Sequence, residues 1–335
     1  MVKVRFSKGK RPIFAYPRSA RKGGIPVQNA HRASRLWRAI AKNWGLYLLI
    51  APSFILLLFF TYFPMYGVQI AFKDYNLMAG ITRSPWADPW YKYFQRFFNS
   101  YQSELVIKNT LLLGLYSIAA GYPIPILLGL LINQMRPGKF RRVYQTVTYI
   151  PHFISTVVLV GMLNIMLSPS SGLIGAIYKL FGAQAPNLLA SPRLFPSLYV
   201  WSDVWQNAGW DAIVYLAALA SVDPNLYEAA TVDGAGKRQK MLYIDLPMLL
   251  PMSCVMLILR AGGIMNVSFE KAYLMQNDLN LSVSEMISTY VYKLGIINSQ
   301  YSLSAAVNLF NTLVNLALLL LVNQITRHLG DTSIL

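Results

Sequence analysis

Long runs of apolar residues, separated by short polar segments, extend along most of the chain from residue 46 to residue 325. A helix needs about 20 mostly apolar residues to cross the roughly 30 Å hydrocarbon core of a bilayer. Runs of this length indicate about six membrane-spanning helices. The sequence therefore predicts an all-α, polytopic membrane protein. The spans are expected at residues 46–70, 106–132, 144–167, 194–220, 248–267 and 303–325.

Charged residues are few, and their distribution predicts the orientation of the chain. Of the 335 residues, 55% are hydrophobic and 13% are charged, with a formal net charge of +17. Basic patches also occur in nucleic-acid-binding proteins, but here Lys and Arg gather without any Asp or Glu at residues 1–43 and 133–142. Because basic loops stay on the cytoplasmic side of a membrane, these segments, both termini and residues 227–247 should face the cytoplasm.

The same reasoning divides the chain into three parts. Loops that mix acids with bases alternate with the basic ones, and we expect them outside. The predicted parts are a basic cytoplasmic arm at residues 1–43, a membrane domain at 44–325 and a short cytoplasmic tail at 326–335, with outside loops at about 71–105, 168–193 and 268–302.

Several polar residues interrupt the predicted spans, where contact with lipid would be unfavourable. Asp203, Asn207 and Asp211 recur at every fourth position of the fourth span, so a helix places them on one face. Two interpretations stay open: a structural network in which an acid pairs with Arg260, or part of a water-filled translocation path. The candidate path residues are Trp201, Asp203, Trp205, Gln206, Asn207, Trp210, Asp211, Arg260, Asn308 and Asn311, with the tryptophans expected to complete one aromatic and polar surface.

These acids do not indicate catalysis. Carboxylates that cleave a glycosidic bond lie about 5 to 9.5 Å apart, whereas a helix separates Asp203 from Asp211 by about 12 Å. His152 has no second His or acid at a ligand spacing, and Cys254 is the single cysteine. A packed His152 is therefore expected, with no metal site and no disulfide.

The segment YEAATVDGAGKRQKMLYIDLP, residues 227–247, contains a Gly-Lys pair that suggests a phosphate-binding loop. That loop requires a further glycine five positions earlier and a Ser or Thr directly after the lysine. Thr231 and Arg238 occupy these two positions. We therefore expect the chain to bind no nucleotide or other cofactor of its own.

Local signals predict a helix-turn-helix at residues 223–247 instead. Asp223 is suited to cap a helix, and Pro224 suits its first position. The first helix should run to about Val232, and Gly234 should form the left-handed turn that ends it. A second helix should then lead into the fifth span.

This segment also resembles the EAA signature of permease subunits in binding-protein-dependent ABC importers. The matching residues, at the spacing of the signature and between the fourth and fifth predicted spans, are Glu228, Ala229, Ala230, Gly234, Ile244, Leu246 and Pro247. Further stretches, among them PSFILLLFFTYFPMYGVQIAFKDYN and VWQNAGWDAIVYLAAL, resemble the polysaccharide branch of the maltose-type sugar importers. The resemblance covers about residues 44–325.

The resemblance implies the type I ABC importer permease fold in a bacterial cytoplasmic (inner) membrane. Such a subunit pairs with a second, homologous permease subunit and with two ATP-binding cassette ATPase subunits on the cytoplasmic face. An extracytoplasmic solute-binding protein delivers the oligosaccharide. The short helix of the EAA loop sits in a cleft of the ATPase, and ATP and Mg bind to that partner, so the chain is not itself an enzyme.

The resemblance also implies an oligosaccharide that contains uronic acid, such as alginate. From the residues alone, Arg260 and Lys108 are suited either to attract carboxylates or to balance Asp203 and Asp211. The alternative function is a proton-coupled secondary sugar carrier, which also has polar midplane residues and broken helices. A carrier of that kind needs no EAA loop. A membrane-embedded sugar-processing enzyme would need a close pair of acids.

Overall fold

The computed structural model describes residues 42–330, and helices form the regular structure of this part. Within these residues, one antiparallel bridge between Lys73 and Trp86 is the β-type pairing recorded. The predicted all-α class is therefore confirmed. Most of the predicted basic arm, and the last part of the predicted tail, lie outside the described residues.

The chain divides into two compact units between Met65 and Tyr66. The described part of the first unit consists of α2 (Trp44–Leu57), the π-helical turn η1 (Leu58–Tyr62) and α3 (Phe63–Met65). These helices bury none of their residues within the chain, although nearly all are apolar. Because a helix that is apolar on all sides is suited to lipid, the first unit fits the first predicted span.

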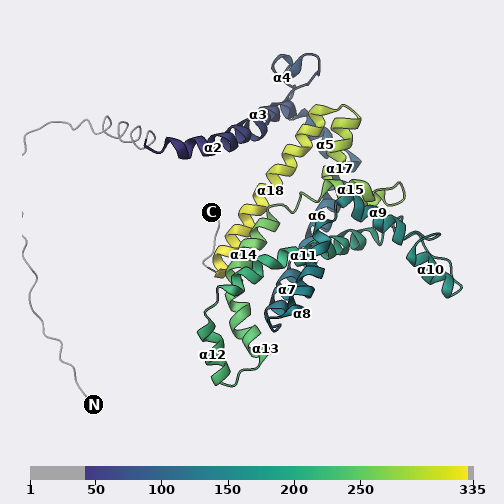
Figure 1. Ribbon diagram of the computed structural model, residues 1–335. Helices are drawn as coiled ribbons and strands as arrows, with labels where there is room; N and C mark the ends of the chain where they lie inside the picture. Colours follow the sequence, from purple (N-terminus) through teal and green to yellow (C-terminus); the bar gives the residue numbers. More distant parts are fainter. Residues whose placement is uncertain (1–41, 331–335) are drawn as a thin grey trace, which may run out of the picture. The chain divides into compact units, whose positions relative to one another are not determined.

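The second unit contains all later helices (Figure 1). In chain order they are η2 (Tyr66–Phe72), α4 (Gly80–Arg83), α5 (Lys92–Phe98), α6 (Tyr101–Gly121), α7 (Pro123–Asn133), α8 (Lys139–Tyr149), η3 (Ile150–Phe153), α9 (Thr156–Met166), α10 (Leu173–Leu180), α11 (Phe195–Ala220), α12 (Pro224–Val232), α13 (Lys237–Lys240), η4 (Met241–Asp245), α14 (Leu246–Ala261), α15 (Phe269–Met275), α16 (Leu281–Ser284), α17 (Ile287–Tyr292), η5 (Lys293–Ile297) and α18 (Tyr301–Gly330).

Four of the described helical stretches are long and apolar enough to cross a membrane: Trp44–Phe72, Tyr101–Asn133, Lys237–Ala261 and Tyr301–Ile325. They correspond to the first, second, fifth and sixth predicted spans. The fifth starts earlier than the sequence indicated, because α13 and η4 run into α14 without a break, and it ends earlier, at Ala261.

The third predicted span, residues 144–167, is not one straight helix. η3 and α9 meet at a bend of 97°, where Ile154 and Ser155 adopt extended backbone. The Ser155 hydroxyl oxygen accepts a hydrogen bond from the Val158 N–H and so caps α9. The apolar run predicted a membrane segment but gave no sign of this cap, so the single span is corrected to a bent pair.

The fourth predicted span is a single helix, α11, of 26 residues. It is not among the stretches that are apolar enough to cross a membrane by composition. The reason is the polar set Asp203, Gln206, Asn207 and Asp211, which the sequence already placed in it. α11 is shielded by protein instead, because it packs against α6, α7 and α14.

Tight contacts between helices in the second unit depend on glycine. A Cβ atom at Gly209 of α11 would overlap the carbonyl group of Thr148 at the end of α8. A Cβ atom at Gly114 of α6 would overlap the carbonyl oxygen of Ile264. Small residues at such points let backbones approach closely, as is common between membrane helices.

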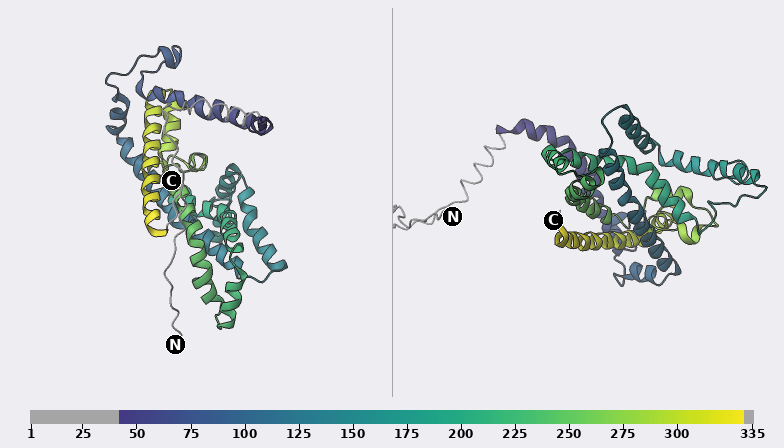
Figure 2. Two further views of the ribbon diagram at one scale, coloured as in Figure 1. Left: turned by 90° about the vertical axis from the view of Figure 1, so that its left-hand side faces the viewer. Right: turned by 90° about the horizontal axis from the view of Figure 1, so that it is seen from below.

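α12 and α13 lie at one end of the second unit, below α7 and α14 in Figure 1. The two further views show the same hairpin at the edge of this unit, continuous with α14 (Figure 2). α18 packs along α14 and reaches α5 and α17 toward the opposite end. The segment that resembles the EAA signature thus lies at one end of the second unit.

Candidate functional site

α12 begins where the sequence predicts. The Asp223 carboxylate accepts a hydrogen bond from the Asn225 backbone N–H at 2.9 Å, and Pro224 occupies the first turn. This cap satisfies an N–H group that has no partner inside the helix. α12 ends at Val232, also as expected.

The turn after α12 is a Schellman motif centred on Gly234. The φ angle of Gly234 is 79°, in the left-handed region. Its N–H donates to the Thr231 carbonyl at 3.1 Å, and the Ala235 N–H donates to the Ala230 carbonyl at 2.8 Å. These bonds satisfy carbonyls at the helix end, and glycine adopts the required conformation without strain. The predicted left-handed turn is confirmed.

The residues that match the EAA signature form two groups. Residues 228–230 lie on α12, where Glu228 and Ala229 are exposed and Ala230 is half-buried. Among the described residues, none forms an ion pair or a hydrogen bond with the Glu228 carboxylate. Ile244, Leu246 and Pro247 lie separately, where η4 joins α14. The first group presents a free carboxylate beside two small side chains, a surface suited to a narrow groove that carries a basic residue.

Asp203, Asn207 and Asp211 form a polar stripe along α11, and two ion pairs fix its two acids. Arg260, at the end of α14, donates to the Asp211 carboxylate. Lys271 of α15 places its Nζ 3.5 Å from Oδ1 of Asp203. Asn207 lies between the two acids and donates from Nδ2 to Asp203 Oδ1 at 3.2 Å. The expectation that an acid of the stripe pairs with Arg260 is confirmed.

His152 extends this network. Its Nδ1 lies 2.9 Å from Asn207 Oδ1 and donates to it in the tautomer that this oxygen requires. The imidazole also stacks on Trp210, with ring centroids 4.5 Å apart and 6° between the planes. His152 is therefore a packed residue of the network. Among the described residues there is no group of three His, Cys, Asp or Glu side chains that could hold a metal ion.

A polar cavity of about 180 Å³ borders the network. Asp203 and Arg260 line it together with Ser117, Asn266 and Ser268. The lining offers hydrogen-bond donors and acceptors as well as charges of both signs. Such a surface is suited to the hydroxyl and carboxylate groups of a sugar.

The structure does not bring the three tryptophans together. Trp201 and Trp205 lie about half a helical turn from Asp203 and Asn207, and they line a separate apolar cavity of about 770 Å³ with leucine and methionine side chains of α9. The Trp201 Nε1–H donates to the Tyr116 hydroxyl at 2.9 Å. The expected single aromatic and polar surface is thus corrected to two surfaces on different faces of α11.

Gln206 also has a different position from the one expected. Its side chain is buried, and Nε2 donates to the Ile154 carbonyl at 2.7 Å. That carbonyl lies at the bend between η3 and α9, where the helical hydrogen-bond ladder is interrupted. Gln206 therefore provides a hydrogen-bond donor for a carbonyl at the break in the third span, which explains why an amide side chain is buried at this position.

The asparagines of α18 separate in the same way. Asn311 and Asn315 donate to Asn266 Oδ1 at 3.2 and 3.0 Å, and Asn315 Oδ1 accepts from the Met265 N–H at 3.0 Å. These bonds fix Met265 and Asn266, in the segment that follows α14. Asn311 and Asn315 do not line the polar cavity themselves but contact Asn266, which does. Asn308 is exposed and lines another cavity, of about 390 Å³.

Comparison with known proteins decides the family. A family model described as the binding-protein-dependent transport system inner membrane component matches residues 121–330, which include α11, α12 and both ion pairs of the stripe. The chain belongs to this family. It is thus an inner-membrane component, and the relatives are ABC transporter permease subunits rather than enzymes.

The similarity extends over nearly the whole permease. The chain is 41% identical over 303 residues to the polygalacturonan/rhamnogalacturonan transport system permease protein YteP of Bacillus subtilis, which covers 90% of this chain and 94% of that protein. It is 36% identical over 314 residues to protein LplB of Bacillus subtilis, which covers 94% and 98%.

Solved structures agree. A chain of a bacterial ABC transporter involved in the import of the acidic polysaccharide alginate is 38% identical to this permease, with a TM-score of 0.81. The match covers 88% of this chain and 99% of that chain. The predicted type I ABC importer permease fold is therefore confirmed.

Two residues of the permease gave no signal in the sequence pattern. Lys271 lies in a segment expected outside, yet it is buried, and its Nζ also lies over the Tyr199 ring at 4.9 Å from the centroid. Asp245 lies between Ile244 and Leu246 and is 0% exposed. A single charge in a polar segment looks like an ordinary solvated group, so only the fold reveals that both are enclosed.

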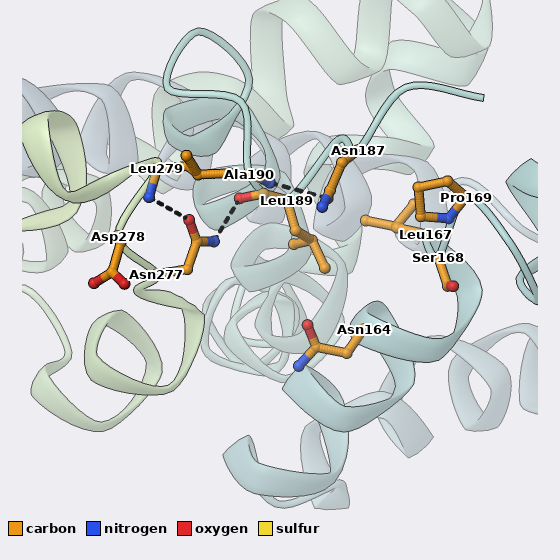
Figure 3. A pocket seen from close by; sticks show the side chains of 10 residues that line it. All are labelled: Asn164, Leu167, Ser168, Pro169, Asn187, Leu189, Ala190, Asn277, Asp278 and Leu279. Atoms are coloured by element: carbon orange, nitrogen blue, oxygen red, sulfur yellow. Dashed lines mark hydrogen bonds between the residues drawn. The ribbon is translucent and has the colours of Figure 1, made fainter. Parts of the chain in front are cut away.

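A further polar cavity of the permease, about 450 Å³, lies among segments expected outside (Figure 3). Asn277 forms part of its wall: its Nδ2 donates to the Leu189 carbonyl at 3.1 Å, and its Oδ1 accepts from the Leu279 N–H at 3.1 Å. Asn187 Oδ1 accepts from the Ala190 N–H at 3.2 Å. These bonds give the cavity a fixed backbone rim.

Proposed function

We propose that this permease is one membrane-spanning subunit of an ATP-driven importer that carries oligosaccharides containing uronic acid. The observation that carries the proposal is the likeness, over nearly the full chain, to a permease chain of an alginate importer. The identity to a polygalacturonan/rhamnogalacturonan permease supports it, because polygalacturonan, like alginate, is a polymer of uronic acids.

The proposed assembly has four kinds of component. A second, homologous permease subunit completes the membrane channel, and two ATPase subunits bind ATP and Mg on the cytoplasmic face. A solute-binding protein delivers the sugar, and one similar structure is a complex with an alginate pentasaccharide-bound periplasmic protein. α12 is proposed to dock on an ATPase subunit through Glu228, Ala229 and Ala230, because this helix is exposed and its carboxylate is unpaired.

The polar network of α11 is proposed to line part of the sugar path. Arg260 and Lys271 supply positive charge that can attract the carboxylates of the sugar. Each of these bases is already paired with an acid of the protein, Arg260 with Asp211 and Lys271 with Asp203. A transport path must hold its substrate weakly enough to release it. Bases that are balanced by acids meet this requirement, because an incoming carboxylate has to compete with an internal one.

Transport in proteoliposomes tests the proposal. The complete complex, with its binding protein outside and ATP inside, should take up a labelled oligouronate, and unlabelled oligouronate should compete. The matched control is the same oligosaccharide with its carboxyl groups reduced to alcohols, which should compete poorly. Equal uptake of the reduced sugar would contradict the acidic substrate. Uptake driven by a proton gradient without ATPase subunits would instead establish the secondary carrier.

A further inference from the structure

Asp245 is a wholly buried carboxylate at a junction of three segments. It ends η4 and directly precedes Leu246 and Pro247. Its Oδ1 accepts a hydrogen bond from the Tyr227 hydroxyl of α12. Its Oδ2 accepts from Nε2 of Gln134, the residue that caps α7, at 2.7 Å. One side chain therefore joins α12, the end of α7 and the start of α14.

One buried carboxylate accepts both hydrogen bonds at this junction. A buried carboxylate is unfavourable unless hydrogen bonds satisfy it, and no ion pair of the described residues involves Asp245. Its two oxygens instead serve two neutral donors that approach from different helices. Burial, together with the bond to Asp245, raises the pKa of Tyr227 to about 12. The phenol therefore remains a donor at physiological pH and up to strongly alkaline conditions.

α12 has little else to fix its position. None of its nine residues is buried. Tyr227 and Ala230 are half-buried, and the Tyr227 hydroxyl forms the hydrogen bond to Asp245. A second link, from Lys240 Nζ to Thr231 Oγ1 at 2.6 Å, is exposed and lies within the hairpin itself. α12 is thus attached to the bundle by a polar contact rather than by an apolar core.

The junction at Asp245 is connected through α7 to the polar network of α11. α7, which Gln134 caps, packs closely on α11: a Cβ atom at Gly129 of α7 would lie 3.1 Å from Cβ of Tyr215. Tyr215 lies one helical turn beyond Asp211. A continuous series of packed groups therefore runs from α12 through Asp245 and α7 to the stripe of α11.

We propose that Asp245 is a positioning residue for energy coupling, which makes α12 move as one body with α7 and the start of α14. This inference rests on the proposed function, in which an ATPase subunit displaces α12. Without the carboxylate, α12 would follow the ATPase while the bundle stays behind. ATP would then be hydrolysed with little movement of sugar.

Two spin labels provide a test that does not depend on which sugar is carried. They are placed at the exposed positions Asn225→Cys on α12 and Leu131→Cys on α7, in a Cys254→Ser background. In the full complex, the distance between the labels should be the same with and without ATP. In Asp245→Ala it should change or broaden when ATP binds. A label distance that changes in the parent complex, or one that stays fixed in Asp245→Ala, would overturn the proposal.

Transport measurements separate positioning from simple loss of folding. Asp245→Ala should lower the amount of sugar moved per ATP hydrolysed by about tenfold, within the usual range of coupling between sites. Asp245→Asn should restore most of the ratio, because the amide fills the same space and, after rotation of the Gln134 amide, can bond to both partners. An Asp245→Asn variant as defective as Asp245→Ala would contradict the proposal.

A milder pair of variants keeps the test decisive if Asp245→Ala does not assemble. Tyr227→Phe removes one hydroxyl and should lower the same ratio in the same direction. Tyr243→Phe makes the same chemical change at an exposed position of η4 and should leave the ratio at the parent value. Equal behaviour of the two variants would overturn the proposal. The function itself fails separately, if the parent complex binds no ATPase subunit or moves no sugar with ATP.

Discussion

Gly234 and Asp211 constrain the permease in two different ways at the scale of single residues. Gly234 is required for its backbone conformation, because its φ angle is 79° and the space around it is open. Asp211 is required for its charge, because it faces the guanidinium of Arg260 in a partly buried position. One residue sets the angle of a helix and the other balances a charge, so substitutions at the two sites should fail for different reasons.

Replacing Gly234 should disturb the α12 hairpin without a steric clash. The left-handed conformation costs a residue with a Cβ atom roughly 1 to 2 kcal/mol, and Gly234→Val should therefore speed hydrogen exchange of the α12 amides and reduce uptake. Gly234→Asn is the matched control, since Asn tolerates this conformation. Slow exchange and full uptake in Gly234→Val would show that the turn does not depend on glycine.

Breaking the Arg260–Asp211 pair should be worse than removing it. Each single variant, Arg260→Met or Asp211→Asn, leaves a partly buried group without its partner. For a fully buried pair that loss is about 3 to 5 kcal/mol, and it should be smaller here because both side chains remain about a quarter exposed (27% and 26%). Thermal unfolding of the purified complex should place the double variant nearer the parent than either single variant. Additive losses would exclude a direct pair.

At the scale of the elements, the sequence predicted helices well and their breaks poorly. The apolar runs located α6 with α7, α14 and α18, and the cap and turn residues located α12, because these signals are local. The bend before α9 depends on Gln206, which is 52 positions away from the Ile154 carbonyl that it satisfies. A contact of that range leaves no periodic pattern in the sequence, so the apolar run of residues 144–167 did not show how this span is bent.

The approach of α8 to α11 depends on the absence of a side chain at Gly209. Gly209→Ala would place a Cβ atom against the backbone of Thr148, and overpacking of this kind typically costs about 1 to 3 kcal/mol. We expect a lower unfolding temperature of the complex. Gly161→Ala in α9 is the control, because nothing lies within 4 Å of its new Cβ atom and alanine favours a helix by roughly 1 kcal/mol. Equal stability of the two variants would contradict the close approach.

At the scale of the whole molecule, the candidate site is a network of residues that are far apart in the sequence. The stripe on α11 was visible in the sequence because helical periodicity lies within one segment. Lys271 pairs with Asp203 of the stripe, and Asn266 lines the polar cavity beside it. Both residues come from the segment after α14, and their positions depend on the fold of the entire second unit. Trp201 and Trp205 were expected on the same surface as Asp203 because they are close to it in the sequence. On a helix, a separation of two residues places side chains on opposite faces.

The orientation of the permease in the membrane remains a prediction from its loop charges, and the structure supplies positions at which to test it. Met78 is 95% exposed in a loop expected outside, and Lys139 is exposed beside the basic loop expected in the cytoplasm. In a Cys254→Ser background, a membrane-impermeant maleimide added to intact cells or spheroplasts should label Met78→Cys. It should label Lys139→Cys only after the membrane is permeabilised. The background variant alone should remain unlabelled, and labelling of Lys139→Cys from outside would reverse the proposed orientation. In that case α12, which the predicted topology places on the same side of the membrane as Lys139, would have no access to an ATPase in the cytoplasm.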